Sequence, residues 1–431
     1  MNFGEFVCRR RDARTLVVQP RMGFADPARM RAGLAATQRS GTAMVGATTV
    51  GTITVDSFTR LGDLDSVMWA LRAGTGLNGY PIVSHDPAVT HQVLDGVHAD
   101  DFPVQVRHGS AQPQQIVRGL VEAGLSASEG GPVSYCLPYG RTPLRESVRN
   151  WREACELLLG APEEPHLETF GGCLMGQLCP PSQLVAVSVL EAMFFQQHGI
   201  RSVSVSYAQQ THMAQDQEAI AALRRLCTEL LPPGGWHVVV YAYMGRYPQT
   251  AVGARNLLSR AAELAVSTGS ERLIVKTIAE AERIPTIAEN VAALEHAALA
   301  AQAARTMAPL AVEGHREDGD SQVYREARVL LDAVLNCAPD IGDALIRAFA
   351  RGLLDIPYCL HPDNAGVARG CLDSEGRLQW ADIGSLPLAG LVDNTRRHPI
   401  TSASFLTSLS YVQDHYDRVA LAAGHAGRRT S

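Results

Sequence analysis

The sequence lacks the features that would place the protein outside a reducing cytoplasm. No apolar run among its 431 residues reaches membrane-spanning length, and no apolar stretch followed by a small-residue cleavage site opens the chain. Its nine cysteines form no CxxC pair and no zinc-like spacing, and their number is odd. We therefore expect free thiols, a cytoplasmic location, no secretion signal and no membrane contact.

Basic residues are not in excess, and the common cofactor motifs are missing. There are 38 Lys and Arg against 44 Asp and Glu, and the formal net charge is −6. Nucleic acid is therefore not expected as a partner, because phosphate binding usually shows as a basic face. GxGxxG, Walker A and HExxH motifs do not occur, and His85, His91, His98 and His108 lack metal-ligand spacing. Nicotinamide, nucleoside-triphosphate and zinc mechanisms lack support, and no metal site is predicted.

What the sequence does contain is an alternation of apolar, β-branched runs with longer segments of helical periodicity. That alternation is typical of βα units around a parallel sheet. The eight predicted strands are 15–19, 52–58, 103–107, 126–136, 167–170, 202–207, 237–243 and 273–276. The helices predicted between them are 27–36, 64–72, 113–123, 144–159, 182–198, 216–231 and 251–266. The sequence thus predicts an α/β fold of the (β/α)8 TIM-barrel type.

The chain beyond the eighth predicted strand adds further elements. An Ala-rich helix over 287–306 follows that strand, and helices over 323–335 and 341–353 lead into a turn-rich segment with short strand potential. We expect a catalytic barrel over residues 1–310 and a smaller C-terminal α+β lobe over residues 311–431 packed on it.

Cations follow several of the predicted strands. Arg21, Arg60 and Arg107 come at or just after the first three strands. His108 follows Arg107, and Lys276 ends the eighth strand. Each alone is more often a solvated loop residue, but the active site of such a barrel lies at the C-terminal ends of its strands. Because arginine binds a carboxylate through a planar fork of donors, three converging arginines favour a substrate with two carboxylates.

A complementary anion lies in the segment SEGGPVSYCLPYG. Glu129 precedes two glycines, and Tyr135, Pro138 and Tyr139 follow in the same loop. One interpretation is that Glu129 begins a turn and the tyrosines pack as core aromatics. The other is that the carboxylate receives an ammonium group. Together with the arginines, the second interpretation describes a site for an acidic amino acid.

Lys276 and Glu280 are four residues apart at the end of the eighth predicted strand. On a helix they could form a simple surface ion pair. At the mouth of a barrel, the same donor and acceptor would suit a hydroxyl-rich group such as a ribose. A Schiff-base lysine is the competing interpretation of Lys276.

Ordered motifs along nearly the whole chain carry a resemblance to a known family. They are QPRMG, TVDSFTR, LNGYP, VRHG, SEGGPVSYCLPY, MGRYPQ, VKTIAEAERIPT, DIPY and NAG. The chain resembles the large (epsilon) subunit of glutamate mutase, also called methylaspartate mutase, an adenosylcobalamin-dependent isomerase. The resemblance implies a barrel whose mouth docks on a separate small cobalamin-binding subunit, in a heterotetramer of two large and two small chains.

The resemblance also assigns roles to residues. Family residues that hold the substrate match Arg21, Arg60, Arg107, His108, Glu129, Tyr135 and Tyr139. Of these, Arg107 and Glu129 are the expected catalytic residues. Family contacts to adenosylcobalamin match Gly23, Asn78, Pro138, Tyr247, Lys276, Glu280 and Ile284.

The implied reaction is a radical carbon-skeleton rearrangement that interconverts L-glutamate and L-threo-3-methylaspartate. The protein would hold charged fragments in place and exclude water. The Asp-x-His-x-x-Gly pattern of the small subunit is absent from these 431 residues, so a partner chain is expected. Two departures from the family pattern, Arg246 in MGRY and Cys136 in SYC, bear on cofactor fit.

Three other readings stay open from the sequence. The chain could be a mutase for another acidic amino acid, or a cobalamin-independent lyase or aldolase that acts on a dicarboxylate through Lys276. It could also be a non-catalytic dicarboxylate-binding barrel. The physiological direction, glutamate breakdown or methylaspartate supply, is equally open.

Overall fold

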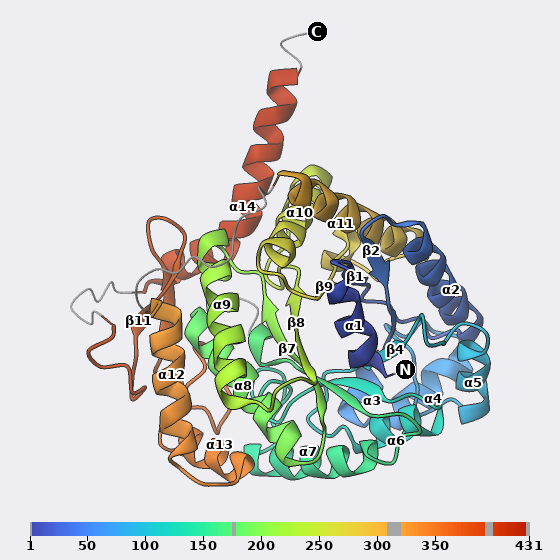
Figure 1. The fold of residues 1–431 in the computed structure, drawn as a ribbon, viewed down its shortest axis with the longest axis horizontal. Helices are drawn as coiled ribbons and strands as arrows, with labels where there is room; N and C mark the ends of the chain where they lie inside the picture. Colours follow the sequence, from blue (N-terminus) through green and yellow to red (C-terminus); the bar gives the residue numbers. More distant parts are fainter. Residues whose placement is uncertain (1, 175–177, 308–319, 393–399, 428–431) are drawn as a thin grey trace.

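A parallel sheet closed into a barrel forms the centre of the molecule (Figure 1). The computed structural model describes residues 2–174, 178–307, 320–392 and 400–427. The strands run in the order β2-β1-β9-β8-β7-β6-β5-β4-β3. They are β1 (Leu16–Gln19), β2 (Ala47–Thr49), β3 (Gly51–Thr54), β4 (Val104–Arg107), β5 (Ala127–Gly130), β6 (His166–Thr169), β7 (Ser202–Ala208), β8 (Trp236–Tyr241) and β9 (Arg272–Ile274).

The barrel closes through β2 and β3. These two strands are separated only by Val50, yet β2 pairs with β1 and β3 pairs with β4, all in parallel. The two ends of the sheet are thus joined by one bent strand. With β2 and β3 counted together, the barrel has eight strand positions. The predicted TIM-barrel class is confirmed.

Helices surround the barrel, as βα alternation requires. They are α2 (Pro27–Ala43), α4 (Leu64–Ala73), α5 (Pro87–Leu94), α6 (Gln114–Glu122), α7 (Leu144–Leu158), α8 (Pro181–Gln197), α9 (Met213–Leu230), α10 (Ala251–Ser267) and α11 (Ile287–Met307). Helix α8 is apolar on all sides and buried along almost its whole length. Its outer side is covered by α12 (Gln322–Leu335) and α13 (Ile341–Ala350), so it needs no polar face.

A short helix, α1 (Phe3–Asp12), covers the opening at the N-terminal ends of the strands (Figure 1). Phe3 is almost fully buried there, 5.1 Å from the His166 ring and under the guanidinium of Arg272. Among the described residues, a ligand would therefore enter from the opposite end of the barrel, at the carboxyl ends of the strands.

The C-terminal segment has the expected mixture of helix and strand. After α12 and α13 come β10 (Arg369–Leu372) and β11 (Leu378–Asp382), which pair antiparallel, and α14 (Ser402–Gly427). The predicted domain boundary between residues 310 and 311 lies outside the described residues and stays a prediction. No helix in the described ranges is long and apolar enough to cross a membrane.

Three predicted strands end earlier than expected. The run 52–58 ends as a strand at Thr54, because Asp56 accepts hydrogen bonds from the backbone N–H groups of Phe58 and Thr59 and starts α3 (Ser57–Leu61). The run 126–136 ends as a strand at Gly130, where a positive φ of 139° turns the chain. The predicted strand 273–276 ends at Ile274, and Lys276 lies two residues beyond it.

Candidate active site at the mouth of the barrel

The carboxyl ends of β4 and β5 bring Arg107 and Glu129 together. Arg107 Nε donates a hydrogen bond to Glu129 Oε2 at 2.7 Å. Both residues are buried, with 4% and 3% of their surface exposed. Burial opposes the charge on Arg107, but the acidic side chains around it, Glu129 foremost, raise the pKa of the guanidinium well above its ordinary value. The site therefore contains a permanent cation paired with a buried carboxylate.

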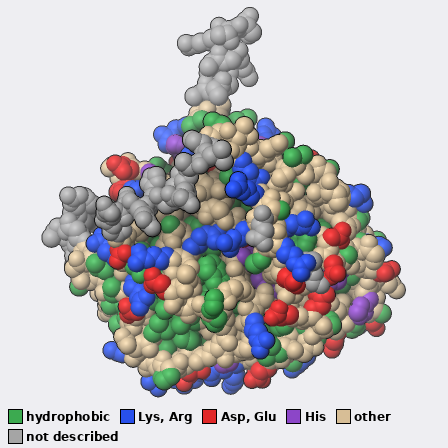
Figure 2. Space-filling view, in the orientation of Figure 1, with side chains coloured by type: hydrophobic (Ala, Val, Ile, Leu, Met, Phe, Trp, Pro, Cys, Tyr) green, Lys and Arg blue, Asp and Glu red, His purple; other side chains and the backbone are tan. Residues whose placement is uncertain are grey.

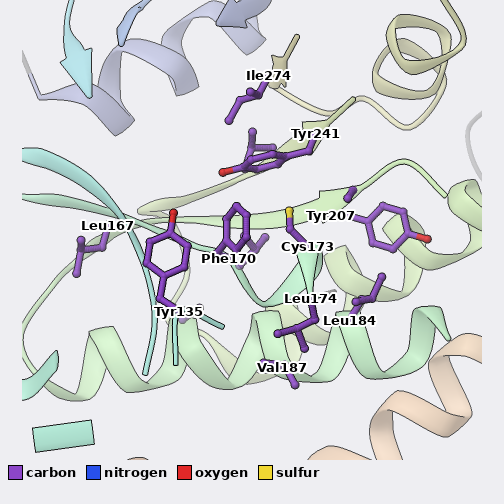
Figure 3. Close-up of a cluster of buried hydrophobic side chains, with 14 of the residues drawn as sticks. Tyr135, Leu167, Phe170, Cys173, Leu174, Leu184, Val187, Tyr207, Tyr241 and Ile274 are labelled. Carbon is purple, nitrogen blue, oxygen red and sulfur yellow. The ribbon is translucent and has the colours of Figure 1, made fainter. Parts of the chain in front are cut away.

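Glu129 meets tyrosine hydroxyls at both of its oxygens. Tyr135 donates to Oε1 from the turn after β5, and the hydroxyl of Tyr241, at the end of β8, lies 2.9 Å from Oε2. Figure 3 shows these two rings on either side of Phe170. Because a carboxylate oxygen can accept two hydrogen bonds, Oε1 keeps one acceptor position open among the described residues.

The turn that carries Tyr135 is held by a buried glutamate of α8. Glu191 accepts hydrogen bonds from the backbone N–H groups of Val133 at 3.2 Å and Ser134 at 2.9 Å. A Cβ added to Gly131 would lie 2.0 Å from Glu191 Oε1, so the glycine permits this approach. The SEGGP motif is thus explained by the close packing of the turn on α8.

Arg60 is in the last turn of α3 and does not directly follow a strand. Its Nε donates to the carbonyl of Val55 at 2.8 Å. Burial lowers the pKa of its guanidinium, and the nearby Arg21 adds to that effect, whereas Tyr135 and Glu129 oppose it. Arg60 is thus within electrostatic range of both Arg21 and Glu129. That the three arginines act as one substrate-binding cluster stays a prediction.

Arg21 connects the cluster to the segment after β9. Its Nη1 lies 3.1 Å from Glu280 Oε2, so the ion pair of Glu280 is with Arg21. The ammonium of Lys276 lies 4.5 Å from the centre of the Tyr247 ring. Burial lowers the pKa of Lys276 to about 8, against the attraction of Glu280.

His108 presents a buried donor to the site. Its Nδ1 accepts a hydrogen bond from the Ser110 N–H at 3.0 Å, so the proton of the neutral ring resides on Nε2. That Nε2 is buried without a partner among the described residues. The ring stacks on Trp151 with centroids 5.8 Å apart. Burial, with help from Arg60 and Arg107, lowers the pKa of His108 to about 3.

Comparison with known proteins places this chain in a family. The family model described as Methylaspartate mutase E chain matches residues 1–407. The chain belongs to that family. The resemblance seen in the sequence is confirmed.

Curated relatives of this family member are named glutamate mutase epsilon subunit. The protein of Yersinia enterocolitica is 32% identical over 352 residues, which are 78% of this chain and 72% of the relative. That of Treponema denticola is 30% identical over 78% of this chain and 71% of its own, and that of Haloarcula marismortui 29% identical over 78% and 70%. A Proteus mirabilis N-acetylneuraminate lyase structure, 10% identical, covers 94% of this chain and 98% of its own with a TM-score of 0.35, which is too low to support a conclusion.

Residues of this family member that were predicted to contact the cofactor do not all line one cavity. Lys276 and Tyr247 line a cavity of 610 Å³ next to α10, together with Arg246 and Gln413. Pro138 lies in the turn beside Tyr139, which is 52% exposed.

The remaining members of that predicted set have other surroundings. Asn78 accepts a hydrogen bond from the Ser57 N–H at the start of α3. Gly23 packs on Thr54, whose carbonyl oxygen would lie 2.2 Å from an added Cβ. Ile284 is 42% exposed, and Glu280 pairs with Arg21. The presence of Gly23 and Asn78 at these positions is thus explained by packing and by a hydrogen bond at the start of α3, without a cofactor.

Sequence reasoning missed the layer of polar side chains beneath the mouth. Tyr241, Glu168 and Arg272 point into the barrel and are fully buried. Gln19 and Gln105 join them, and both contact Arg272. The available signal was the presence of polar residues within apolar strands, as in VVQP and FPVQVR.

Proposed function

We propose that this chain is the catalytic large subunit of an adenosylcobalamin-dependent glutamate mutase, interconverting L-glutamate and L-threo-3-methylaspartate. The observation that carries the proposal is the buried Glu129 carboxylate, which keeps an open acceptor position on Oε1 inside a cluster of arginines. An ammonium group fits that position, and the two carboxylates of glutamate fit the guanidinium groups. Membership in the mutase family supports the same substrate.

In this proposal the substrate carboxylates bind to Arg21, Arg60 and Arg107, and His108 Nε2–H and Tyr139 add hydrogen bonds. His108 suits that task because its neutral ring presents a buried N–H donor that has no partner among the described residues. Glu129 holds the amino group and can adjust its protonation. These groups keep charged fragments in place and exclude water while bonds rearrange.

The cavity beside Lys276 fits a bulky, hydroxyl-rich cofactor group. It has a volume of 610 Å³, and the hydroxyl of Tyr247, on its wall, is buried without a partner among the described residues. Lys276 and Tyr247 would hold sugar hydroxyls of adenosylcobalamin there, and Glu280, Gly23, Asn78, Pro138 and Ile284 stay proposed as further contacts. When bound, that cofactor supplies homolytic carbon–hydrogen chemistry, which the amino-acid side chains at this mouth do not provide.

The proposal includes a partner. A small subunit with the Asp-x-His-x-x-Gly pattern would bring the cobalamin to the mouth of this barrel, in a cytoplasmic heterotetramer of two large and two small chains. The epsilon-subunit name of the relatives supports a multi-subunit enzyme.

Reconstitution tests the function directly. The chain is mixed with a cobalamin-binding small subunit that is active with another epsilon subunit, adenosylcobalamin and L-glutamate, and 3-methylaspartate is followed by proton NMR. Turnover that depends on every component supports the proposal. Absence of product with a partner shown to be competent contradicts it.

The lowered pKa of Lys276 favours one rival, an aldolase or lyase that uses this amine as a nucleophile. Treatment with borohydride and a keto acid, followed by mass spectrometry, distinguishes the two. The mutase proposal predicts no adduct at Lys276.

A further inference from the structure

The hydroxyl of Tyr241 connects two buried carboxylates. It lies 2.9 Å from Glu129 Oε2, accepts a hydrogen bond from Arg107 Nη2 at 3.1 Å, and also bonds to Glu168 Oε1. Glu168 is on β6, and Tyr241 is on β8 at 0% exposure. The predicted substrate residues thus continue inward into a second layer of the barrel.

That second layer is fixed from below. Glu168 Oε2 is ion-paired with Arg272 and accepts a hydrogen bond from Ser204 Oγ at 3.2 Å. Arg272 is also held by Gln19 and by Gln105, and its exposure is 0%. With two arginines and two glutamates, the combined network of Arg107, Glu129, Glu168 and Arg272 is electrically balanced. Glu168 is therefore a rigid anchor for whatever binds its other oxygen.

A phenol has one proton, and here two carboxylates are within its reach. Burial raises the pKa of Tyr241 well above its ordinary value, against the effect of Arg107, so the hydroxyl keeps that proton. When the proton points to Glu168, the phenol oxygen is free to accept from Arg107 Nη2. Glu129 then has Arg107 Nε and Tyr135 as its donors and retains acceptor capacity.

We propose that Tyr241 and Glu168 are positioning residues for recognition of the substrate amino group. Tyr241, anchored on Glu168, keeps its own proton and the second nitrogen of Arg107 away from Glu129, so that the Glu129 carboxylate can accept the substrate ammonium. The inference rests on the proposed function of the site and adds the residues that set its selectivity for an amino dicarboxylate.

Two substitutions disturb this arrangement in different ways. Tyr241→Phe keeps the ring, its contact with Phe170 and its contact with the Arg107 guanidinium, but removes the hydroxyl. Arg107 Nη2 then turns to Glu129, and Nε and Nη2 together form a bidentate pair with the Glu129 carboxylate. Glu168→Gln places its amide oxygen toward Arg272 and its NH2 toward Tyr241, so that the phenol proton is donated to Glu129. In both variants Glu129 has less capacity for an ammonium group.

The matched control is Tyr207→Phe. Tyr207 is on the neighbouring strand β7, has 0% exposure, and donates to the buried carboxylate of Asp216 at 2.9 Å. Figure 3 shows its hydroxyl directed away from Tyr241 and Tyr135. The control therefore loses the same kind of hydrogen bond in the same sheet without touching the site.

The test compares two ligands in the reconstituted enzyme with adenosylcobalamin: L-glutamate as substrate, and glutarate, which has both carboxylates but no amine, as competitive inhibitor. We expect Tyr241→Phe and Glu168→Gln to raise KM for L-glutamate about tenfold, with a smaller change in kcat, because an ammonium loses a charge-assisted hydrogen bond. The Ki of glutarate should stay within about twofold of wild type on the same reasoning. Tyr207→Phe should leave both constants unchanged.

The outcomes are distinguishable. If the Ki of glutarate rises by the same factor as KM, or if Tyr207→Phe has the same effect, the two residues have only a structural role and the inference is wrong. If Tyr241→Phe does not fold, as judged by thermal melting, Glu168→Gln decides by the same criterion. If the wild-type complex does not convert L-glutamate, the proposed function fails and the inference fails with it.

Discussion

The guanidinium of Arg107 makes two contacts that one ammonium group could not reproduce. Its Nε binds Glu129 at 2.7 Å while its Nη2 binds the Tyr241 hydroxyl at 3.1 Å, and its Cζ lies 5.0 Å from the centre of the Tyr241 ring. A lysine at this position would offer a point charge on a shorter side chain. The geometry of the fork, beyond its charge, is therefore what the site uses.

We predict that Arg107→Lys lowers kcat/KM for L-glutamate about 100-fold, which is about 3 kcal/mol of lost transition-state stabilisation. The measurement is steady-state turnover in the reconstituted complex. Arg118→Lys, on the exposed face of α6, is the matched control and should leave kcat/KM unchanged. Equal activity of Arg107→Lys and wild type would show that charge alone suffices.

Sequence reasoning found the mouth residues because they follow apolar runs, and the C-terminal ends of barrel strands meet at one place. Arg107 was found in this way, whereas Glu129, which lies inside the predicted strand 126–136, was found because it precedes two glycines and a loop with two tyrosines. Glu168 and Arg272 were missed although their side chains form an ion pair. Glu168 lies within β6 and Arg272 begins β9. The two are 104 positions apart, and a single sequence does not reveal which inward-facing residues meet across a barrel.

At the scale of elements, the turn after β5 depends on α8. Glu191 accepts hydrogen bonds from the Ser134 backbone, the Ser134 hydroxyl and the Phe170 backbone, all buried. We predict that Glu191→Gln lowers the free energy of unfolding by about 2 kcal/mol, because the amide NH2 would face N–H donors. Chemical denaturation measures this change.

The same substitution should also lower turnover, since the turn carries Tyr135 to Glu129. Glu156→Gln on the exposed side of α7 serves as the comparison. A Glu191→Gln variant with wild-type stability would mean that the turn holds its shape without α8.

Helix α14 fastens the loop between β8 and α10. Asp417 accepts hydrogen bonds from the Gln249 and Thr250 N–H groups at 3.0 and 2.9 Å, and Gln413 donates to the carbonyl of Tyr247 at 2.8 Å. Arg246, the unusual residue of the MGRY motif, reaches Ser410 at 2.8 Å. The departure from the family pattern therefore has a partner on α14.

We predict that Asp417→Asn speeds hydrogen exchange of the amides of residues 245–250 about tenfold, because one acceptor at the N-cap of α10 is lost, at about 1 kcal/mol. Exchange is followed by mass spectrometry. Asp414→Asn, an exposed position on the same helix, should leave the loop unchanged. Unaltered exchange in Asp417→Asn would show that α14 does not restrain the loop.

Elements were predicted best where one periodicity holds over many residues, as in α7 and α10. The sequence predicts β3 but not β2, because Ala47–Thr49 is too short and too polar to be recognised as a strand. The predicted strand 52–58 extends into the first two residues of α3 because the apolar run continues to Phe58, and only the capping bonds of Asp56 reveal the change. Helices α1, α5 and α14 were not predicted.

At the scale of the whole molecule, charge is mixed on the surface and buried in the barrel. Figure 2 shows acidic and basic side chains interspersed over one face. Inside, burial lowers the pKa values of His108, His166 and His237. Near pH 6.5 these histidines therefore bind protons in the unfolded chain but not in the folded protein. The free energy of unfolding falls as the pH drops below about 6.5.

Two buried carboxyl groups act in the opposite direction. Burial raises the pKa values of Glu191 and Asp216 to about 7, so the folded protein binds their protons before the unfolded chain does. The free energy of unfolding gains from these two groups as the pH falls from about 7 to about 4. The net loss between about pH 6.5 and 4.5 is thus shallow, and it steepens below that range.

Substitution of His237 separates the contribution of one histidine to the pH dependence of stability from the contributions of the other groups. The ring of His237 stacks on His166 at 5.3 Å and 7°, and neither ring nitrogen has a partner among the described residues. Phenylalanine keeps the stacking and cannot take up a proton. We predict that His237→Phe gains stability relative to wild type by about 1.4 kcal/mol for each pH unit below about 6.5, because other titrating groups cancel in the difference. Urea unfolding of the two proteins at pH 7.5, 6 and 5 measures it, and parallel curves would mean that His237 takes up its proton in the folded protein.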